Sequence, residues 1–116
     1  MDESTLERFR ARLLQMRAEL LTTDDTARDA ARPVTLDQSS VGRVSRMDAM
    51  QGQAMAVAAQ QRRALQMRGI ETALARIDAG EFGVCQSCGE DIDPQRLEFD
   101  PTSALCIACA SAREKR

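Results

Sequence analysis

Two cysteine pairs of identical spacing are the residues of this chain best suited to chemistry. Each pair has the form Cys-x-x-Cys, and the four members are Cys85, Cys88, Cys106 and Cys109. Two such pairs about 15–20 residues apart are typical of a tetrahedral site in which four thiolates hold one metal ion. Gly89 follows the first pair and suits the positive-φ turn that such a site needs. We therefore predict one structural Zn²⁺ ion bound by these four side chains.

The same cysteines could instead form disulfides, a redox centre or an iron site. Disulfide frameworks are typical of small secreted domains, whereas this chain opens with Met1-Asp2-Glu3-Ser4 and shows no apolar signal segment. A redox Cys-x-x-Cys is normally one pair within alternating strands and helices, a pattern not seen in this sequence. Iron binds the same sulfur ligands, so ligand type does not exclude it. Zinc in a reducing cytoplasm is the most economical interpretation.

The composition argues against an enzyme. The chain has no histidine for general acid–base chemistry and no cysteine beyond the two pairs. It also lacks a glycine-rich phosphate loop, and a four-sulfur metal site has no open position for a catalytic water. We therefore expect no enzymatic activity.

Charge and hydropathy exclude two further classes of protein. No run approaches the roughly 18 apolar residues of a membrane span. The formal net charge is −2, and residues 81–116 carry seven acidic and four basic side chains, a charge of −3. A protein held on nucleic acid mainly by phosphate contacts is normally basic. We therefore expect neither a membrane protein nor a sequence-specific DNA-binding protein.

The segment before the cysteines has the pattern of two long helices. Ser4 and Glu7 have the spacing of a capping box, and a helix is expected to run from there to about Ala31, before Pro33. Residues 33–44 lose the periodicity and gather turn formers, so they are expected to connect the helices. Within the first helix, apolar residues recur at steps of three and four, which is a heptad seam: Leu6, Phe9, Leu13, Met16 and Leu20.

A second helix is predicted from Ser45 to Ala79, with Gly80 ending it. Methionines in its first half are interpreted as seam residues rather than a partner-binding face, because methionine fills irregular gaps between helices. The predicted inner stripe comprises Met47, Met50, Ala54, Val57, Gln61, Ala64 and Leu65, continued by Ile70, Leu74 and Ile77.

Two long helices with a short connector must lie antiparallel. We therefore predict a mainly α fold: a long antiparallel two-helix coiled coil joined to a small four-cysteine zinc-finger module with a short C-terminal helix. Residues 1–80 form the hairpin, with its tip near 33–49, and residues 81–116 form the zinc finger. A dimer with a four-helix bundle is the alternative to a projecting two-stranded rod, and the oligomeric state is open.

The residues around the cysteines resemble a known family. The segment Glu81-Phe82-Gly83-Val84-Cys85-Gln86-Ser87-Cys88-Gly89-Glu90, followed by Ile92, Arg96-Leu97-Glu98, Pro101-Thr102 and Leu105-Cys106-Ile107-Ala108-Cys109, is similar to the DksA/TraR C4-type zinc finger. The resemblance implies a bacterial, cytoplasmic transcription regulator that binds RNA polymerase. Such proteins insert a coiled-coil tip into the secondary channel and modulate initiation, often with the alarmone ppGpp in the stringent response.

The family's tip motif, Asp-x-x-Asp-x-Ala, is carried over less directly. An ungapped count from Cys85 places it on residues 42–47, which do not match. Arg46, Asp48 and Ala49 lie next to that position, so they are the candidates for a polymerase-contacting tip. The alternative is that Asp48 only stabilises the first turn of the helix through the helix dipole.

The same count indicates which alarmone positions remain. Arg62 and Arg96 keep basic residues that the family uses around ppGpp, whereas other basic positions become Gly69, Asp100 and Ala110. Because an anion with several phosphates needs clustered cations, we expect weak or absent synergy with ppGpp.

Two other functions are compatible with these residues. One is a zinc-ribbon module that binds a different protein partner. The other is a modulator of transcript cleavage or elongation, as in the Gre factors, whose acidic tips act at the polymerase active site.

Overall fold

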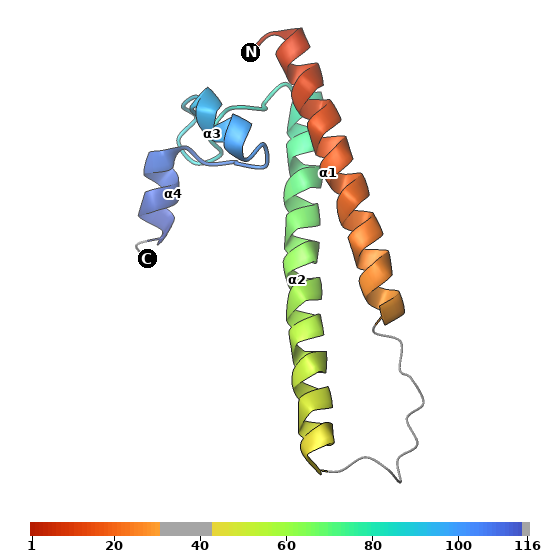
Figure 1. Ribbon diagram of the computed structural model, residues 1–116. Helices are drawn as coiled ribbons and strands as arrows, with labels where there is room; N and C mark the ends of the chain where they lie inside the picture. Colours follow the sequence, from red (N-terminus) through yellow and green to blue (C-terminus); the bar gives the residue numbers. More distant parts are fainter. Residues whose placement is uncertain (31–42, 115–116) are drawn as a thin grey trace.

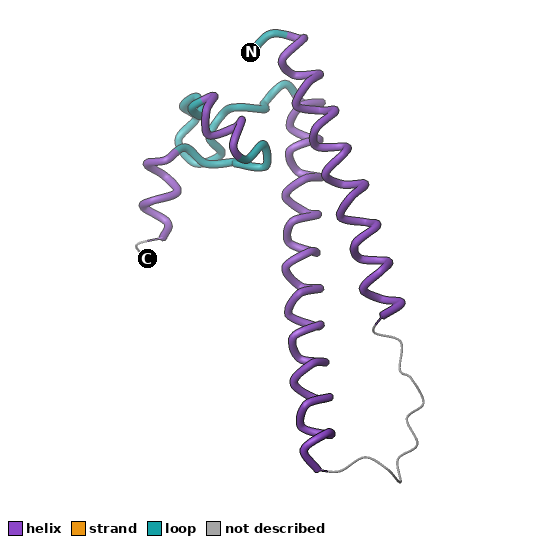
Figure 2. The backbone as a smooth tube through the Cα atoms, viewed as in Figure 1, coloured by secondary structure: helices purple, strands orange, loops and turns teal. Residues whose placement is uncertain are grey.

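Two long antiparallel helices form the body of the protein, and a small module built around the cysteines lies against one end of them (Figure 1). The computed structural model describes residues 1–30 and 43–114. Its helices are α1 (Glu3–Ala30), α2 (Arg43–Ala79), α3 (Pro94–Phe99) and α4 (Ile107–Glu114). Figure 2 shows that the described loops are concentrated between α2 and α4. The predicted fold class is confirmed.

The start of α1 differs from the prediction. The carboxylate of Asp2 accepts a hydrogen bond from the backbone N–H of Thr5 at 2.8 Å, and hydrogen bonding with the Thr5 side chain and with this N–H lowers the pKa of Asp2. Ser4 therefore lies inside the helix, and the predicted capping box of Ser4 and Glu7 is wrong. Asp2 occupies the cap two residues before Ser4, because its carboxylate accepts from a free N–H of the first turn.

The end of α2 follows the prediction. Gly80 has a φ of 76°, which only glycine adopts without strain. Its N–H donates to the carbonyl of Ile77, and the N–H of Glu81 donates to the carbonyl of Arg76 at 2.8 Å. These two bonds are the Schellman pattern that terminates a helix. Gly80 therefore turns the chain out of the rod and into the zinc module.

The heptad seam of α1 packs against the second half of α2 and against the module. Phe9 and Leu13 are buried, as are Ile70 and Ile77 on α2. The Phe9 ring lies 5.3 Å from the ring of Phe82, between centroids. The remaining seam residues predicted in this region are partly buried around this core: Leu6, Met16, Leu20 and Leu74. The seam prediction is therefore confirmed for α1 and for the C-terminal half of α2.

The predicted inner stripe is wrong in the first half of α2. Met47, Met50 and Leu65 are 57%, 70% and 61% exposed, and Val57 is 47% exposed. Ala54, Gln61 and Ala64 are exposed as well. The preference for seam methionines is thus overturned, and Met55 is also 72% exposed.

The register of the two helices explains this difference. Arg10 pairs with Asp78 at 2.6 Å, and Arg63 pairs with Asp24 at 3.2 Å. In each pair the α1 and α2 residue numbers add up to 87 or 88. With this register, residue 30 at the end of α1 lies opposite about residue 57 of α2. The first part of α2 extends past α1, and at residue 63 the face toward α1 is already occupied by Arg63 rather than by the predicted stripe.

Some predictions fall beyond what the structure describes. Residues 33–42 of the predicted tip lie outside the described residues, and the division between residues 80 and 81 stays a prediction. Among the helices in the described ranges, none combines the length and the apolarity needed to cross a membrane.

Candidate metal centre

The first cysteine pair lies in a tight knuckle after α2. Val84 and Asp91 form an isolated antiparallel bridge, and the N–H of Cys85 donates to the carbonyl of Glu90 at 2.8 Å. Gly89 has a φ of 76° and donates its N–H to the carbonyl of Cys85. The predicted positive-φ turn is confirmed. It folds the chain back so that both sulfurs of the pair face the same point.

The second pair lies at the start of α4. The N–H of Cys109 points at the sulfur of Cys106 at 3.4 Å, as the N–H of Ser87 does at the sulfur of Cys85. The N–H of Gln86 donates to the carbonyl of Ala104 at 2.9 Å and ties the two knuckles together. N–H groups aimed at sulfur stabilise the thiolate form that a metal requires.

The four sulfur atoms form one cluster. All lie within 4.8 Å of one another, and the sulfurs of Cys88 and Cys106 are 3.7 Å apart. In a tetrahedral zinc site with Zn–S bonds of about 2.3 Å, neighbouring sulfurs are about 3.8 Å apart. All four cysteines are free thiols rather than disulfides. The donor set and its spacing therefore fit one structural Zn²⁺.

The cysteines of the cluster differ in proton affinity. The backbone N–H of Cys106 is the main group that lowers the pKa of the Cys85 thiol, to about 6. The sulfur of Cys106 is the main group that raises the pKa of Cys109, to about 12. Sulfurs this close cannot all become thiolates unless a positive charge offsets their repulsion. A dication at the centre supplies that charge.

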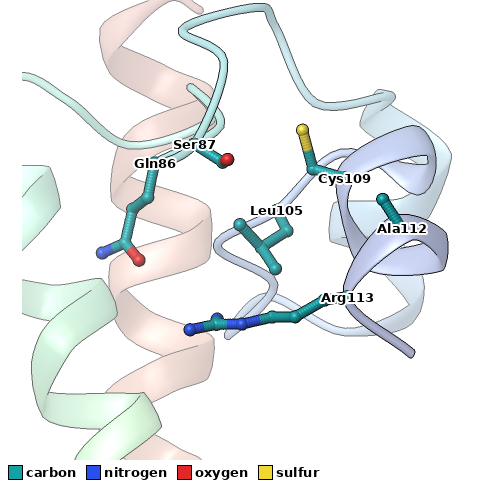
Figure 3. Close-up of a pocket in the computed structure, with 6 residues that line it drawn as sticks. All are labelled: Gln86, Ser87, Leu105, Cys109, Ala112 and Arg113. Atoms are coloured by element: carbon teal, nitrogen blue, oxygen red, sulfur yellow. The ribbon is translucent and has the colours of Figure 1, made fainter. Parts of the chain in front are cut away.

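A hollow of about 450 Å³ lies beside the sulfurs. In Figure 3 the side chain of Arg113 extends from α4 beneath Leu105 toward Gln86. The six lining residues are Gln86, Ser87, Leu105, Cys109, Ala112 and Arg113. Cys109 is the only usual zinc ligand among these six. The hollow therefore adds no ligand to the cluster, which remains a closed structural site.

Two arginines of α1 attach the module to the rod. Both terminal nitrogens of the Arg8 guanidinium donate to the Glu98 carboxylate, and Arg12 donates to the backbone carbonyl of Glu98. The hydrogen bond from Arg8 lowers the pKa of Glu98, and the same bond raises the pKa of Arg8. Sequence reasoning missed this contact because its members are 90 residues apart and no local pattern marks them.

α2 also contacts the module. Arg76 donates to the backbone carbonyls of Glu81 and Val84, just before the first knuckle. A Cβ atom added at Gly69 would lie 3.6 Å from Thr102. The hairpin and the module therefore meet along two faces, and the module has a defined orientation on the rod.

The predicted alarmone residues have different surroundings. Arg96 donates from Nε to the carbonyl of Leu105 at 3.0 Å, so it braces the loop that leads to Cys106. Asp100 accepts hydrogen bonds from the N–H and the hydroxyl of Thr102. Arg62 is exposed on α2. Arg96 and Asp100 thus have structural partners, and the alarmone role of Arg62 and Arg96 stays a prediction.

The predicted tip residues Arg46, Asp48 and Ala49 are exposed on α2. Because α2 begins at Arg43, its first turn contains no acidic residue and Asp48 lies in the second turn. The helix dipole acts mainly within the first turn, so the alternative interpretation of Asp48 loses its support. A polymerase contact by these residues stays a prediction.

The zinc module matches a family model described as the prokaryotic dksA/traR C4-type zinc finger over residues 80–115. The RNA polymerase-binding transcription factor DksA of Haemophilus influenzae is 46% identical over 50 residues, which are 43% of this chain and 34% of that protein. Its namesake in Escherichia coli K12 is 42% identical over 50 residues, 43% of this chain and 33% of that protein. These matches span about a third of the curated relatives' length.

Solved structures match the whole chain. The transcription factor DksA2 of Pseudomonas aeruginosa has a TM-score of 0.77 and 32% identity, covering 99% of this chain and 87% of that one. A transcriptional regulator of Chlamydia trachomatis has a TM-score of 0.62 over 99% of this chain and 93% of that one, and at 21% identity it supports the fold alone. Together with the four-thiolate site, these matches show that the chain belongs to the DksA/TraR family of C4-type zinc-finger proteins.

Proposed function

We propose that this protein binds RNA polymerase and modulates transcription initiation without being an enzyme. The relatives that match its zinc module are named RNA polymerase-binding transcription factors. The single observation that carries the proposal is the match of the entire chain, rod included, to a transcription factor of known structure. A match limited to the zinc finger would support only a shared metal site.

The proposed mode of action is insertion of the rod's distal end into the secondary channel. α2 has 37 residues, about 55 Å of helix, and the zinc module lies at the opposite end from Arg46 and Asp48. The module is held to both helices, so it can dock on the polymerase exterior while the rod reaches inward. The acidic zinc finger also supports a protein partner over sequence-specific DNA.

A binding competition tests the partner and the channel. Core RNA polymerase should retain this protein, and a Gre factor, which occupies the secondary channel, should displace it. Retention that is unaffected by the competitor would place the protein on another surface, and no retention would favour a different partner. Measuring transcript cleavage in the same complexes distinguishes regulation of initiation from a Gre-like role.

A second experiment tests the tip. Asp48→Asn should reduce the effect on transcription about tenfold while binding changes little, if the carboxylate acts after docking. Asp25→Asn is the control, because Asp25 is also an exposed aspartate but lies on α1. Equal effects of both substitutions would refute a specific role for Asp48.

We further propose weak or absent synergy with ppGpp. Arg96 is engaged with the carbonyl of Leu105, and Asp100 adds a carboxylate where the anion would need a cation. Transcription from a ribosomal RNA promoter, with this protein and with or without ppGpp, measures the synergy. A strong response to ppGpp would overturn this part of the proposal.

A further inference from the structure

Three methionines lie close together in the distal part of α2, and we call them the methionine cluster: Met47, Met50 and Met55. They are half of the six methionines in the chain. Their side chains are 57%, 70% and 72% exposed. At about 100° per residue, they fall within an arc of about 140° around the helix. Three thioethers are therefore open to solvent on one side of a short stretch of helix.

The register of the two long helices leaves the methionine cluster uncovered. α1 ends opposite about residue 57 of α2, so it does not reach the turns on which the cluster lies. In Figure 1 the first turns of α2, drawn in yellow, continue past the end of α1. Every residue from 46 to 57 is exposed. The cluster therefore takes no part in the core of the described chain.

Two other methionines have different surroundings. Met16 is partly buried against the core that contains Leu13. Met67 is also partly buried, and it lines a hollow of about 170 Å³ between α1 and α2. Oxidation of these thioethers would place a polar group against the core, whereas oxidation of the cluster would leave the core intact. The chain thus separates methionines that support the fold from methionines that can react without disturbing it.

Accessible thioethers react with peroxides. A sulfur lone pair attacks one oxygen of hydrogen peroxide and the O–O bond breaks. That oxygen stays on sulfur as a sulfoxide, so sulfur loses two electrons and the peroxide is reduced to water. The sulfoxide is polar, and methionine sulfoxide reductases reverse the change: its oxygen leaves as water while two thiols become a disulfide.

We propose that the methionine cluster is a reversible oxidation site that weakens the action of this protein on RNA polymerase. This inference rests on the proposed function, because the cluster lies beside Arg46 and Asp48 at the distal end of the rod. Each sulfoxide adds a strong dipole to an apolar side chain, and that dipole loses water when the rod enters a protein channel. The helix itself should tolerate the change, because changes at exposed positions seldom alter stability. Peroxide should therefore lower the affinity without unfolding the protein.

The first arm of the test maps the modification and needs no polymerase. The full chain with zinc bound is treated with hydrogen peroxide, and mass spectrometry follows the gain of one oxygen at each methionine. Sulfoxide should form in the cluster at least about threefold faster than at Met16 and Met67, because susceptibility follows exposure. Met1 is 57% exposed and should react at a rate similar to that of the cluster. Equal rates at the cluster, Met16 and Met67 would overturn the inference.

The second arm measures the dissociation constant for core RNA polymerase before and after oxidation. The constant of the wild type should rise at least about fivefold on oxidation and return after treatment with methionine sulfoxide reductases. The cluster variant combines Met47→Leu, Met50→Leu and Met55→Leu, which keep an apolar side chain of similar volume but remove the sulfur. Oxidation should change its own constant by less than about twofold. Met16→Leu with Met67→Leu is the matched control, and it should stay as sensitive to oxidation as the wild type.

Zinc content and far-ultraviolet circular dichroism distinguish this site from the cysteines. An affinity loss that accompanies zinc release, or that the cluster variant shares, would assign the effect to the thiolates and overturn the inference. An affinity that oxidation leaves unchanged would also overturn it, but the proposed function would stand. Wild-type protein that fails to bind before oxidation would remove both the proposed function and its regulation.

Discussion

The two ends of α2 use similar side chains in opposite ways. At the base of the rod, Leu13 of α1 is completely buried and Ile70 and Ile77 of α2 are nearly so, beneath the zinc module. In the distal part of α2, residues 46–65, leucine and methionine side chains are more than half exposed. Burial on a helix thus depends on whether a partner reaches the residue. The buried side chains at the base therefore contribute most of the packing, and the exposed ones in the distal part contribute little.

A polar contact marks the boundary between these two regions. Asp24 and Arg63 pair at 3.2 Å with side chains only 21% and 17% exposed. Partly buried ion pairs add little net stability, but they fix the register of paired helices because breaking one leaves a charge poorly solvated. The pair therefore aligns α1 with α2 at the last turns where both helices are packed together.

Loss of the metal should have the largest effect, and it should be confined to the base. Chelation, or Cys106→Ser, should unfold the module, because zinc binding contributes about 10–16 kcal/mol of folding energy in small zinc domains. The helical circular dichroism signal should fall only in part, since α1 and α2 also pack on each other. Ser87→Ala, in the first knuckle but not a ligand, is the control. A variant without zinc that melts like the wild type would contradict this.

The second largest difference is expected when one leucine in each region is truncated to alanine and the free energy of unfolding is compared. Leu13→Ala should lower the free energy of unfolding by about 2–5 kcal/mol, because it opens a cavity in the core. Leu65→Ala should change it by less than about 0.5 kcal/mol, because Leu65 is 61% exposed. Urea denaturation measures both values. Similar losses would mean that the distal part is packed in solution.

A pH-dependent contribution should come from the contact between α1 and the module. Arg8 lowers the pKa of Glu98 below its ordinary value of 4.5, so the folded state binds this proton less readily than the unfolded state. The stabilisation is therefore complete above that value and is lost as the pH falls through the lowered pKa.

Melting temperatures measured from about pH 6 to about pH 4 should thus fall more steeply for the wild type than for Glu98→Gln. Glu114→Gln controls for the loss of one charge, and zinc retention is followed in parallel. Parallel curves for the wild type and Glu98→Gln would show that the ion pair does not contribute.

The smallest effect is expected from two glycines within α2. A Cβ atom added at Gly52 would have no neighbour within 4 Å, and one at Gly69 would make an ordinary contact with Thr102 at 3.6 Å. Alanine should stabilise the helix by up to about 1 kcal/mol at either position. Gly69→Ala should raise the melting temperature, whereas Gly52→Ala should slow only local hydrogen exchange in the distal part. A higher melting temperature for Gly52→Ala would mean that the distal part of α2 and the base unfold together as one cooperative unit.

Short-range patterns account for what could be predicted from the sequence. The four cysteines and Gly89 specify their site through local spacing, and the steps of three and four from Leu6 to Leu20 specify a helix with one buried face. The end of α2 follows from Gly80 alone. Each of these features depends on residues that are close together in the chain.

The remaining features depend on how far one helix reaches along another. The residues from Met47 to Leu65 have the periodicity of a seam, but periodicity does not reveal whether α1 extends far enough to cover them. The pairing of Arg8 and Arg12 with Glu98 joins distant segments without a pattern. Asp2 and Ser4 are both good caps, and only the structure decides between them.

The contact at Glu98 also has a mechanical consequence. α2 is about 55 Å long, so a tilt of about 5° between module and rod would displace the far end by about 5 Å. The hydrogen bonds from Arg8 and Arg12 therefore restrict the angle between the zinc module and the long helices. Removing these hydrogen bonds should leave the module and the helices folded. It should widen the range of positions that the distal end of α2 takes relative to the module.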